Sequence, residues 1–189
     1  MIYLASLSPR RCELLQQIHV KYQQVAVDVN ETCYPNETPP NYVTRLAIAK
    51  AQAGYQATQK QRPTLGADTA VVLGKRIFGK PKDNAEAKVM LQQLSARRHQ
   101  VMTAVAVIAN ARIYSRLSVS QIQFKSLSSE EIEAYIATHE PLDKAGAYGI
   151  QGKAAVFIEH LEGSYSGVMG LPLYETATLL EEIGVDIWQ

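Results

Sequence analysis

The stretch that most constrains the fold is a short apolar run, residues 1–5, followed directly by a helix start. The run predicts a buried strand, while Ser8 is a favoured N-cap residue and Pro9 suits the first helical position. A strand, a tight turn and a helix N-terminus form an anion site, because free N–H groups and the helix dipole point the same way. Arg10 and Arg11 fall in that first turn, where the dipole alone favours acids. They predict a shared external anion, and the simpler alternative is two solvated surface arginines.

Charge and cysteine content narrow the class of protein. The chain of 189 residues has 19 Lys and Arg against 18 Asp and Glu, a net charge of +1, which argues against a general nucleic-acid or membrane-surface binder. No apolar run approaches the roughly 18 residues that span a bilayer. Cys12 and Cys33, without a CxxC spacing, indicate reduced thiols of a cytoplasmic protein. We therefore expect a soluble α/β protein with one domain over residues 1–189.

Hydrophobic periodicity and capping signals predict an alternation of strands and helices. Helices are expected from residue 9, from residues 38–39, over residues 83–94, from residue 128 and after residue 172. Strands are expected at residues 22–29, 69–73, 76–78, 100–109, 112–127 and 154–161, with hairpin turns at 74–75 and 110–111. A phase slip after Val119 predicts a bulge or a bend in the strand of residues 112–127.

Asp68 interrupts an otherwise apolar segment that leads into a predicted strand. A buried carboxylate requires a cation, a metal or several N–H donors, so Asp68 is a candidate site residue. The alternative is a structural aspartate that accepts hydrogen bonds from neighbouring backbone amides. Lys80, directly after the hairpin, is a second candidate for binding an anion, whereas Lys50 in an Ala-rich helix is by itself most simply a solvated cation.

Two glycine-rich loops, residues 143–152 and 162–170, suggest backbone that approaches a ligand closely. Neither has the spacing of a P-loop or a dinucleotide fingerprint, and two mobile surface loops are the alternative. Residues 97–99 are expected to form a solvated turn, and no histidine falls in a candidate cleft motif.

Taken together, these segments resemble the Maf family of nucleoside triphosphate pyrophosphatases, and most closely its dTTP/UTP branch. The similarity rests on S-L-S-P-R-R at 6–11, R-L-A-I-A-K-A at 45–51, G-A-D-T at 66–69, K-P at 80–81, D-K-A-G-A-Y-G-I-Q-G at 143–152 and G-S-Y-S-G-V-M-G-L-P-L at 163–173. It implies an α/β fold, a mixed twisted sheet with flanking helices in two lobes around a central cleft, as in inosine triphosphate pyrophosphatases. It also suggests a homodimer.

The resemblance implies hydrolysis of dTTP and UTP, and of modified pyrimidine triphosphates, to the monophosphate and pyrophosphate. By the same analogy Asp68 is the general base, Glu31 and Asp68 hold a divalent cation (Mg²⁺ or Mn²⁺), and the substrate-binding and specificity residues are Ser6, Arg10, Arg11, Lys50, Thr69, Lys80 and Gln151.

General chemistry is consistent with these implied roles. Carboxylates are the hard oxygen ligands that Mg²⁺ accepts, and cations neutralise a leaving triphosphate. The Gln151 amide offers a donor and an acceptor, which match the C4 carbonyl and N3–H of uracil or thymine. A rotated amide offers the reverse pattern, so Gln151 alone does not exclude cytosine. Two other functions stay open: a nucleotide-binding regulator of septum formation that needs no turnover, and a nucleotidyltransferase, for which the sequence shows no acceptor site.

Overall fold

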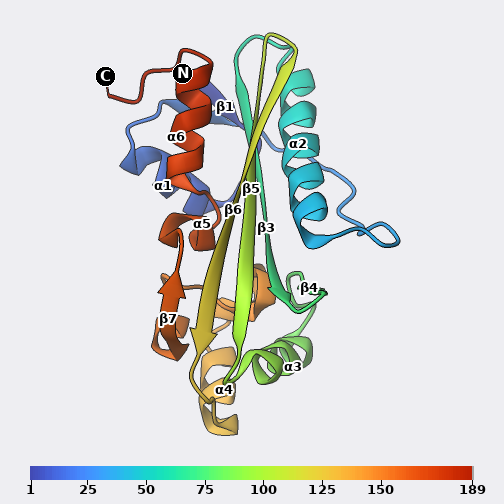
Figure 1. Cartoon of the computed structure of the whole chain (residues 1–189), viewed down its shortest axis with the longest axis vertical. Coiled ribbons are helices and arrows are strands. Elements are labelled where there is room, and N and C mark those ends of the chain that lie inside the picture. The colour runs from blue at the N-terminus through green and yellow to red at the C-terminus, as the bar shows by residue number, and fades with distance from the viewer. Residues whose placement is uncertain (189) are drawn as a thin grey trace.

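The computed structural model describes residues 1–188, which form a mixed seven-stranded sheet with helices on both faces (Figure 1). The strand order is β2-β1-β3-β5-β6-β7, and β4 also pairs with β3. The strands are β1 (Ile2–Leu4), β2 (Tyr22–Gln24), β3 (Thr64–Leu73), β4 (Arg76–Phe78), β5 (Arg98–Ala109), β6 (Arg112–Phe124) and β7 (Ile158–Glu162). β1 is parallel to β2 and β3, and the other pairs are antiparallel. The predicted α/β class is thereby confirmed.

The helices pack on both faces of the sheet, in separate groups. The helices are α1 (Pro9–Gln17), α2 (Pro39–Ala57), α3 (Asn84–Leu94), α4 (Ser129–Ile136), α5 (Tyr165–Met169) and α6 (Leu173–Glu182), with 3₁₀ turns η1 (Glu140–Asp143), η2 (Ala145–Ala147) and η3 (Lys153–Phe157). In Figure 1, α2 covers one face of the sheet, α1 and α6 cover the other, and α3 and α4 pack at the far end. Each group encloses its own cluster of buried apolar side chains.

The strand β3 has an interrupted edge, and this interruption positions the site. Along one edge, β3 pairs with β5 from Thr64 to Val72. Along the other, β1 pairs only with residues 64–65 and β4 only with residues 71–73. Residues 66–70 therefore have no strand beside them on that edge, and Asp68 lies in the middle of the gap.

The helix α2 packs directly against β3 because Gly66 has no side chain. A Cβ atom on Gly66 would lie 2.4 Å from the backbone nitrogen of Ala51 and 2.5 Å from the carbonyl oxygen of Ala47. Alternate residues of a strand share a face, so Gly66 and Asp68 both face α2. This close packing brings Lys50, next to Ala51 in α2, against Asp68.

Most predicted elements are present, the irregularity expected in the strand of residues 112–127 is found in β6, and three local predictions are wrong. The strand expected at 22–29 ends at Gln24. The β5–β6 ladder is regular from Arg98 to Ala109, and the irregularity lies between Gln123 and Phe124, where β6 pairs with β7. Half of the strand expected at 154–161 is the 3₁₀ turn η3. The expected solvated turn at 97–99 is the start of β5, and His99 is buried there.

The first helix begins where the sequence predicts, with Ser8 at the N-cap and Pro9 at the first helical position. The Ser8 side chain makes no capping hydrogen bond, and its backbone N–H instead donates to Ser6 Oγ at 3.2 Å. Within residues 1–188, no helix combines the length and the apolar character that a bilayer crossing needs.

Candidate active site

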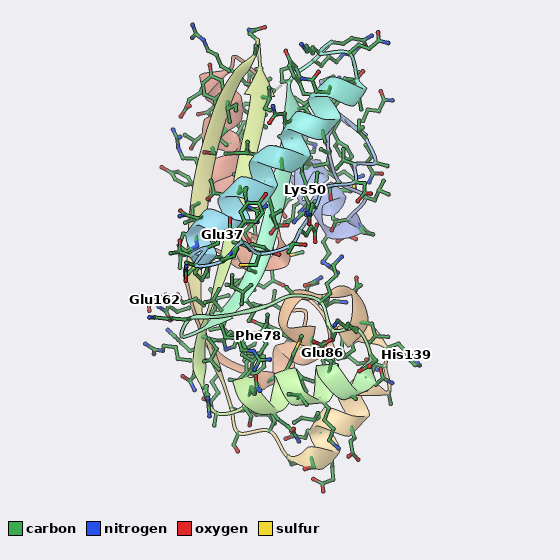
Figure 2. The ribbon with its side chains drawn as sticks, turned by 90° about the vertical axis from the view of Figure 1, so that its right-hand side faces the viewer. Glu37, Lys50, Phe78, Glu86, His139 and Glu162 are labelled. Atoms are coloured by element: carbon green, nitrogen blue, oxygen red, sulfur yellow. The ribbon has the colours of Figure 1, made fainter. Side chains whose placement is uncertain are left out.

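A pocket opens at the interrupted edge of β3, between α1, α2, β4 and the loop of residues 143–151. The predicted site residues that line it are Arg10, Arg11, Glu31, Lys50, Asp68, Thr69, Lys80 and Gln151. Ser6 lies behind this surface, where its hydroxyl accepts hydrogen bonds from Arg11 and Ser8. The chain therefore brings together residues that are up to 145 positions apart in the sequence. Figure 2 shows Lys50 pointing from α2 toward the space between the two ends of the molecule.

The centre of the pocket is a lysine between two carboxylates. Lys50 Nζ lies 2.7 Å from Asp68 Oδ1 and 2.6 Å from Glu31 Oε1. Burial raises the pKa of Asp68, although the charges of Lys50 and Arg11 oppose this shift. Burial acts in the same direction on Glu31, but the hydrogen bond and charge of Lys50, aided by Lys80 and Arg11, hold its pKa below the usual range. The surroundings thus shift the pKa values of the two carboxylates in opposite directions, upward for Asp68 and downward for Glu31.

Arg11 joins the N-terminal turn to the second glycine-rich loop. Its Nε donates to the carbonyl oxygen of Gly170 at 2.9 Å, and its NH1 donates to Ser6 Oγ at 3.2 Å. Burial lowers the pKa of Arg11, with Asp68 opposing the shift, and a guanidinium stays charged across the physiological range. Gly170 has φ of +117°, a left-handed conformation that favours glycine. These contacts orient a charged guanidinium close to Asp68.

Thr69 points to the opposite face of β3 from Asp68 and contacts Thr103 on the neighbouring strand. The Thr69 and Thr103 hydroxyl oxygens are 3.0 Å apart, and Thr103 Oγ1 lies 2.7 Å from the carbonyl oxygen of Gly167. Since Thr103 has one proton to donate and the Gly167 carbonyl can only accept, the Thr69 hydroxyl donates to Thr103. Thr103 is buried and fixes Thr69 relative to the loop of residues 162–170.

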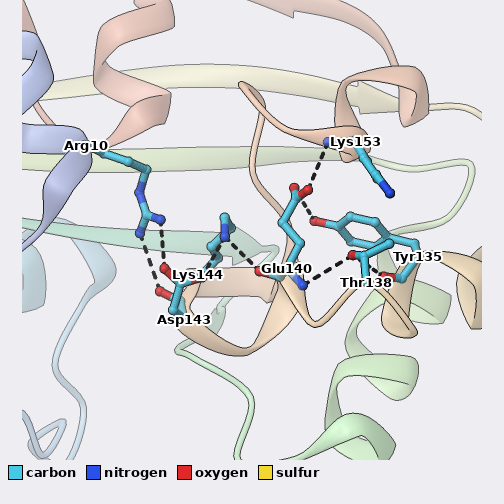
Figure 3. Close-up of polar contacts among 7 residues, drawn as sticks. All are labelled: Arg10, Tyr135, Thr138, Glu140, Asp143, Lys144 and Lys153. Atoms are coloured by element: carbon cyan, nitrogen blue, oxygen red, sulfur yellow. Dashed lines mark hydrogen bonds and ion pairs between the residues drawn. The ribbon is translucent and has the colours of Figure 1, made fainter.

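Arg10 reaches across the pocket to the loop that carries Gln151 (Figure 3). Its NH1 forms an ion pair with Asp143 Oδ2 at 2.9 Å, and Lys144 Nζ binds the other carboxylate oxygen at 2.6 Å. Lys144 also donates to the carbonyl oxygen of Glu140 at 2.7 Å. The pKa of Asp143 is lowered because these two cations outweigh its partial burial. Arg10 therefore links α1 to η1 over the mouth of the pocket.

Glu140 fixes the same loop from the other side. Its Oε1 accepts a hydrogen bond from the Tyr135 hydroxyl at 2.9 Å, and its Oε2 accepts from the backbone N–H of Lys153 at 3.0 Å (Figure 3). A Cβ on Gly152 would lie only 2.0 Å from Glu140 Oε1, so a glycine is needed for this approach. The loop that carries Gln151 is thus anchored at both ends.

Beneath the loop, Tyr148 lines the pocket and is held by His99. The His99 Nε2 and the Tyr148 hydroxyl are 2.8 Å apart, and the ring of Phe124 packs edge-on against both. Burial lowers the pKa of His99 to about 4, so its imidazole is neutral at physiological pH. His99 supports the pocket from inside the core, which is the reverse of the solvated position expected from sequence.

Two predicted residues remain available to a ligand. The ammonium of Lys80 is exposed at the pocket and forms no ion pair within residues 1–188. The Gln151 side chain is also exposed at the pocket wall. In all, five basic side chains and three acidic ones line the pocket, an excess of positive charge that suits a polyanion.

The donor set fits a divalent cation held jointly by the protein and a polyphosphate. Residues 1–188 contain no group of three or more His, Cys, Asp or Glu side chains that could hold a metal alone. However, Glu31 and Asp68 both contact the positive charge of Lys50, so two carboxylates converge on one cation position. Mg²⁺ is usually bound in this way, by one or two carboxylates, substrate phosphates and water.

The sequence did not single out several residues that complete the pocket. Tyr42 lines it, donates to the Glu31 carbonyl oxygen at 3.0 Å, and has a pKa raised to about 12 by burial and by Asp68 and Glu31. Asp143 and Lys144 belong to a glycine-rich loop whose sequence pattern indicates no role for either side chain. Thr103 and Tyr42 occur in ordinary strand and helix patterns, so no local signal distinguishes them.

The fold and the pocket define a class: an α/β protein with a cationic cleft that contains paired carboxylates at an open sheet edge. The chain belongs to the Maf family, because the family model described as "Maf-like protein" matches residues 1–183.

Curated relatives are similar in sequence to this chain over almost its whole length. The chain is 51% identical to the dTTP/UTP pyrophosphatase of Aromatoleum aromaticum, covering 97% of this chain and 95% of that protein. It is 50% identical to the dTTP/UTP pyrophosphatase of Chromobacterium violaceum, with 98% and 96% coverage. Among solved structures, the Staphylococcus aureus Ham1 protein aligns with a TM-score of 0.44 and 16% identity over 65% of this chain and 71% of that chain.

Proposed function

We propose that this protein is a nucleoside triphosphate pyrophosphatase that hydrolyses dTTP and UTP between the α- and β-phosphates, and that it also accepts modified pyrimidine triphosphates. The observation that carries the proposal is the buried Asp68 carboxylate at the centre of a cationic pocket, with Lys50 on one of its oxygens. The names of the relatives support the substrate class. A cytoplasmic location, a homodimer and the absence of a nucleic-acid partner stay predictions.

In this proposal Asp68 takes the proton from the attacking water. Its Oδ1 is bonded to Lys50, while Oδ2 has no hydrogen-bond partner within residues 1–188 and can accept a proton. Burial raises the pKa of Asp68, which makes the carboxylate a better base than an exposed aspartate. Lys50 holds the carboxylate in place, and its positive charge opposes the burial that raises the pKa of Asp68.

The basic residues bind the triphosphate. Lys80 forms no ion pair among residues 1–188, and Arg11 is already oriented by Ser6 and Gly170, so both can contact phosphate oxygens without breaking an ion pair. Fixed positive charges of this kind stabilise the pyrophosphate as negative charge develops on it. Arg10 is bound to Asp143, so it contributes at the edge of the pocket, between the phosphates and the loop that carries Gln151.

Glu31 and Asp68 are the residues that would hold a divalent cation, Mg²⁺ or Mn²⁺. When bound, such an ion neutralises phosphate charge and makes a coordinated water more acidic. Lys50 contacts both carboxylates, so it would keep them oriented toward the cation position, and its ammonium would add to the positive charge that faces the phosphates.

At the other end of the pocket, Gln151 reads the base. An amide that accepts from N3–H and donates to the C4 carbonyl fits uracil and thymine equally well. The apolar side chains of Val71, Phe78 and Met169 line the same pocket and suit a flat pyrimidine ring. No specific contact is expected to separate a C5 methyl group from hydrogen, because one methyl is worth only about 1–3 kcal/mol.

The identity of the products tests the proposal. Purified protein is incubated with dTTP in ¹⁸O-labelled water, with and without Mg²⁺, and the products are separated and weighed by mass spectrometry. The expected result is Mg²⁺-dependent formation of dTMP and pyrophosphate, with one labelled oxygen in either product. Formation of dTDP and phosphate would overturn the assigned bond. Tight dTTP binding without turnover would favour the regulator of septum formation, and transfer of dTMP to an added acceptor would favour a nucleotidyltransferase.

A further inference from the structure

The loop that carries Glu31 has no regular structure of its own. Residues 25–38 join β2 to α2 without a helix or strand, and residues 31–36 are exposed. Even so, the Glu31 carboxylate lies 2.6 Å from Lys50 in the pocket. An exposed loop of this length samples many conformations unless other contacts hold it, so the position of Glu31 needs a separate explanation.

Arg45 on α2 contacts three residues of this loop, Glu37, Thr32 and Tyr34. Its Nε and NH2 bind the two carboxylate oxygens of Glu37 at 2.6 and 2.8 Å, a bidentate pair. Its NH2 also donates to the Thr32 carbonyl oxygen at 3.1 Å. Its guanidinium carbon lies 4.1 Å from the ring centroid of Tyr34. Figure 2 shows Glu37 beside the start of α2, where these contacts gather.

Two hydrogen bonds also join Tyr34 to Glu37 within the loop, and a second residue of α2, Tyr42, binds the loop as well. The backbone N–H of Tyr34 donates to Glu37 Oε2 at 3.0 Å, and that of Glu37 donates to the Tyr34 carbonyl oxygen at 3.1 Å. Arg45 holds the pKa of Glu37 down to about 2, so this carboxylate stays ionised at any physiological pH. The Tyr42 hydroxyl binds the Glu31 carbonyl oxygen at 3.0 Å. Tyr42 and Arg45 are three residues apart, which puts them side by side on α2.

We propose that Arg45 is a positioning residue that acts through Glu37 and Thr32 to hold the Glu31 carboxylate at the cation position beside Asp68. Arg45 does not line the pocket, so it acts at a distance from the phosphates. The inference rests on the proposed function, in which Glu31 is a ligand of the divalent cation. Without Arg45, the polar contacts to Glu31 that remain among the described residues 1–188 are the Tyr42 hydroxyl and the Lys50 ion pair, so cation binding itself must drive more of the ordering of the loop.

The test compares Arg45→Ala, Glu31→Gln and the double variant with a matched control. Arg116→Ala serves as the control, because Arg116 is another partly exposed arginine paired with a glutamate, Glu182, and it lies outside the pocket. Three quantities are measured: amide hydrogen exchange of residues 30–38 without ligand, Mn²⁺ binding in the presence of a non-hydrolysable α,β-imido dTTP, and the Mg²⁺ concentration for half-maximal turnover.

We expect Arg45→Ala to speed exchange in residues 30–38 at least tenfold, to weaken Mn²⁺ binding about tenfold and to raise the Mg²⁺ requirement by a similar factor. At saturating Mg²⁺ the KM for dTTP should stay within about threefold of the parent value, and Arg116→Ala should change none of the three quantities. In the Glu31→Gln background, Arg45→Ala should add little to the loss of Mn²⁺ affinity, because both variants remove the same ligand.

Each contrary outcome has a distinct meaning. Unchanged loop exchange in Arg45→Ala would overturn the inference directly. Faster exchange with unchanged Mn²⁺ binding, while Glu31→Gln weakens that binding, would also overturn it, since the loop would then be ordered without serving Glu31. Unchanged Mn²⁺ binding and Mg²⁺ requirement in Glu31→Gln alone would instead refute the ligand role of Glu31 in the proposed function.

Discussion

Replacing Gly66 by alanine tests whether the direct contact of α2 with β3 sets the geometry of the pocket. The added Cβ would lie 2.4 Å from Ala51 N, 2.5 Å from Ala47 O and 3.0 Å from Ala51 Cα. All three are backbone atoms of a long helix, so no side-chain rotation relieves the clash. Restoring an ordinary contact of 3.4 Å or more requires α2 to move away by about 1 Å.

The expected losses follow from this displacement. Overpacking a tight core typically costs about 1–3 kcal/mol, and a 0.5–1 Å gap forfeits a quarter to half of the dispersion attraction at the contacts it opens. We therefore expect Gly66→Ala to lower the free energy of unfolding by about 2–4 kcal/mol, measured by urea denaturation. Lys50 adjoins Ala51, so the same shift moves it relative to Asp68, and a 1 Å misplacement can lower kcat about 10²-fold.

Gly79→Ala is the control for stability, because a Cβ at Gly79 has no heavy atom within 4 Å. Its free energy of unfolding should stay within about 1 kcal/mol of the parent. If the free energy of unfolding of Gly66→Ala also lay within about 0.5 kcal/mol of the parent value and the variant kept its kcat, the contact between α2 and β3 would not set the geometry of the pocket.

Three further predictions concern the phosphates, the base and the core. Lys80→Ala and Arg11→Ala should each lower kcat/KM for all accepted triphosphates by a similar factor, measured in steady-state assays with dTTP, UTP and dATP. A loss of kcat/KM confined to one of these triphosphates would contradict the prediction. Gln151→Ala should lower kcat/KM for dTTP and UTP more than for purine triphosphates, and an unchanged pyrimidine preference would locate base selection elsewhere. The buried His99, with its pKa lowered to about 4, binds fewer protons in the folded than in the unfolded state between pH 4 and 6.5. The free energy of unfolding should therefore fall as pH falls through that window, by roughly 2–4 kcal/mol in total. In urea titrations, the free energy of unfolding of His99→Gln should fall less over the same pH range than that of the parent.

Local sequence patterns were sufficient to predict most helices and strands and most of the residues that line the pocket. Capping signals fixed the starts of α1, α3 and α4, and the hairpin at Asn110 and Ala111 joins β5 to β6 as predicted. The motif residues meet at one pocket near the open edge of β3. Arg10 and Arg11 lie in the first turn of α1, Glu31, Lys80 and Gln151 lie in loops, and Lys50, Asp68 and Thr69 lie within α2 and β3. Their assigned roles stay predictions.

What the sequence could not show depends on long-range contacts. His99 follows two arginines, a pattern typical of a solvated turn, but its inward position in β5 packs the ring against Phe124 and Tyr148. The apolar residues Ile113, Leu117 and Val119, which set the first phase of the pattern in β6, are exposed, and the irregularity of the strand lies further along, between Gln123 and Phe124. In the same way, nothing around Arg45 indicates that its partners lie in the preceding loop.

The measurement that tests the central claim most directly is single-turnover pyrophosphate release from dTTP by Asp68→Asn, beside calorimetric dTTP binding and thermal unfolding. Because burial raises the pKa of Asp68, the ionised carboxylate destabilises the fold at neutral pH relative to its protonated form, and the neutral amide should not lower the Tm. The account predicts a rate reduced about 10²–10⁴-fold, with dTTP binding retained within about tenfold. A rate within tenfold of the parent enzyme would contradict the role of Asp68 as the base.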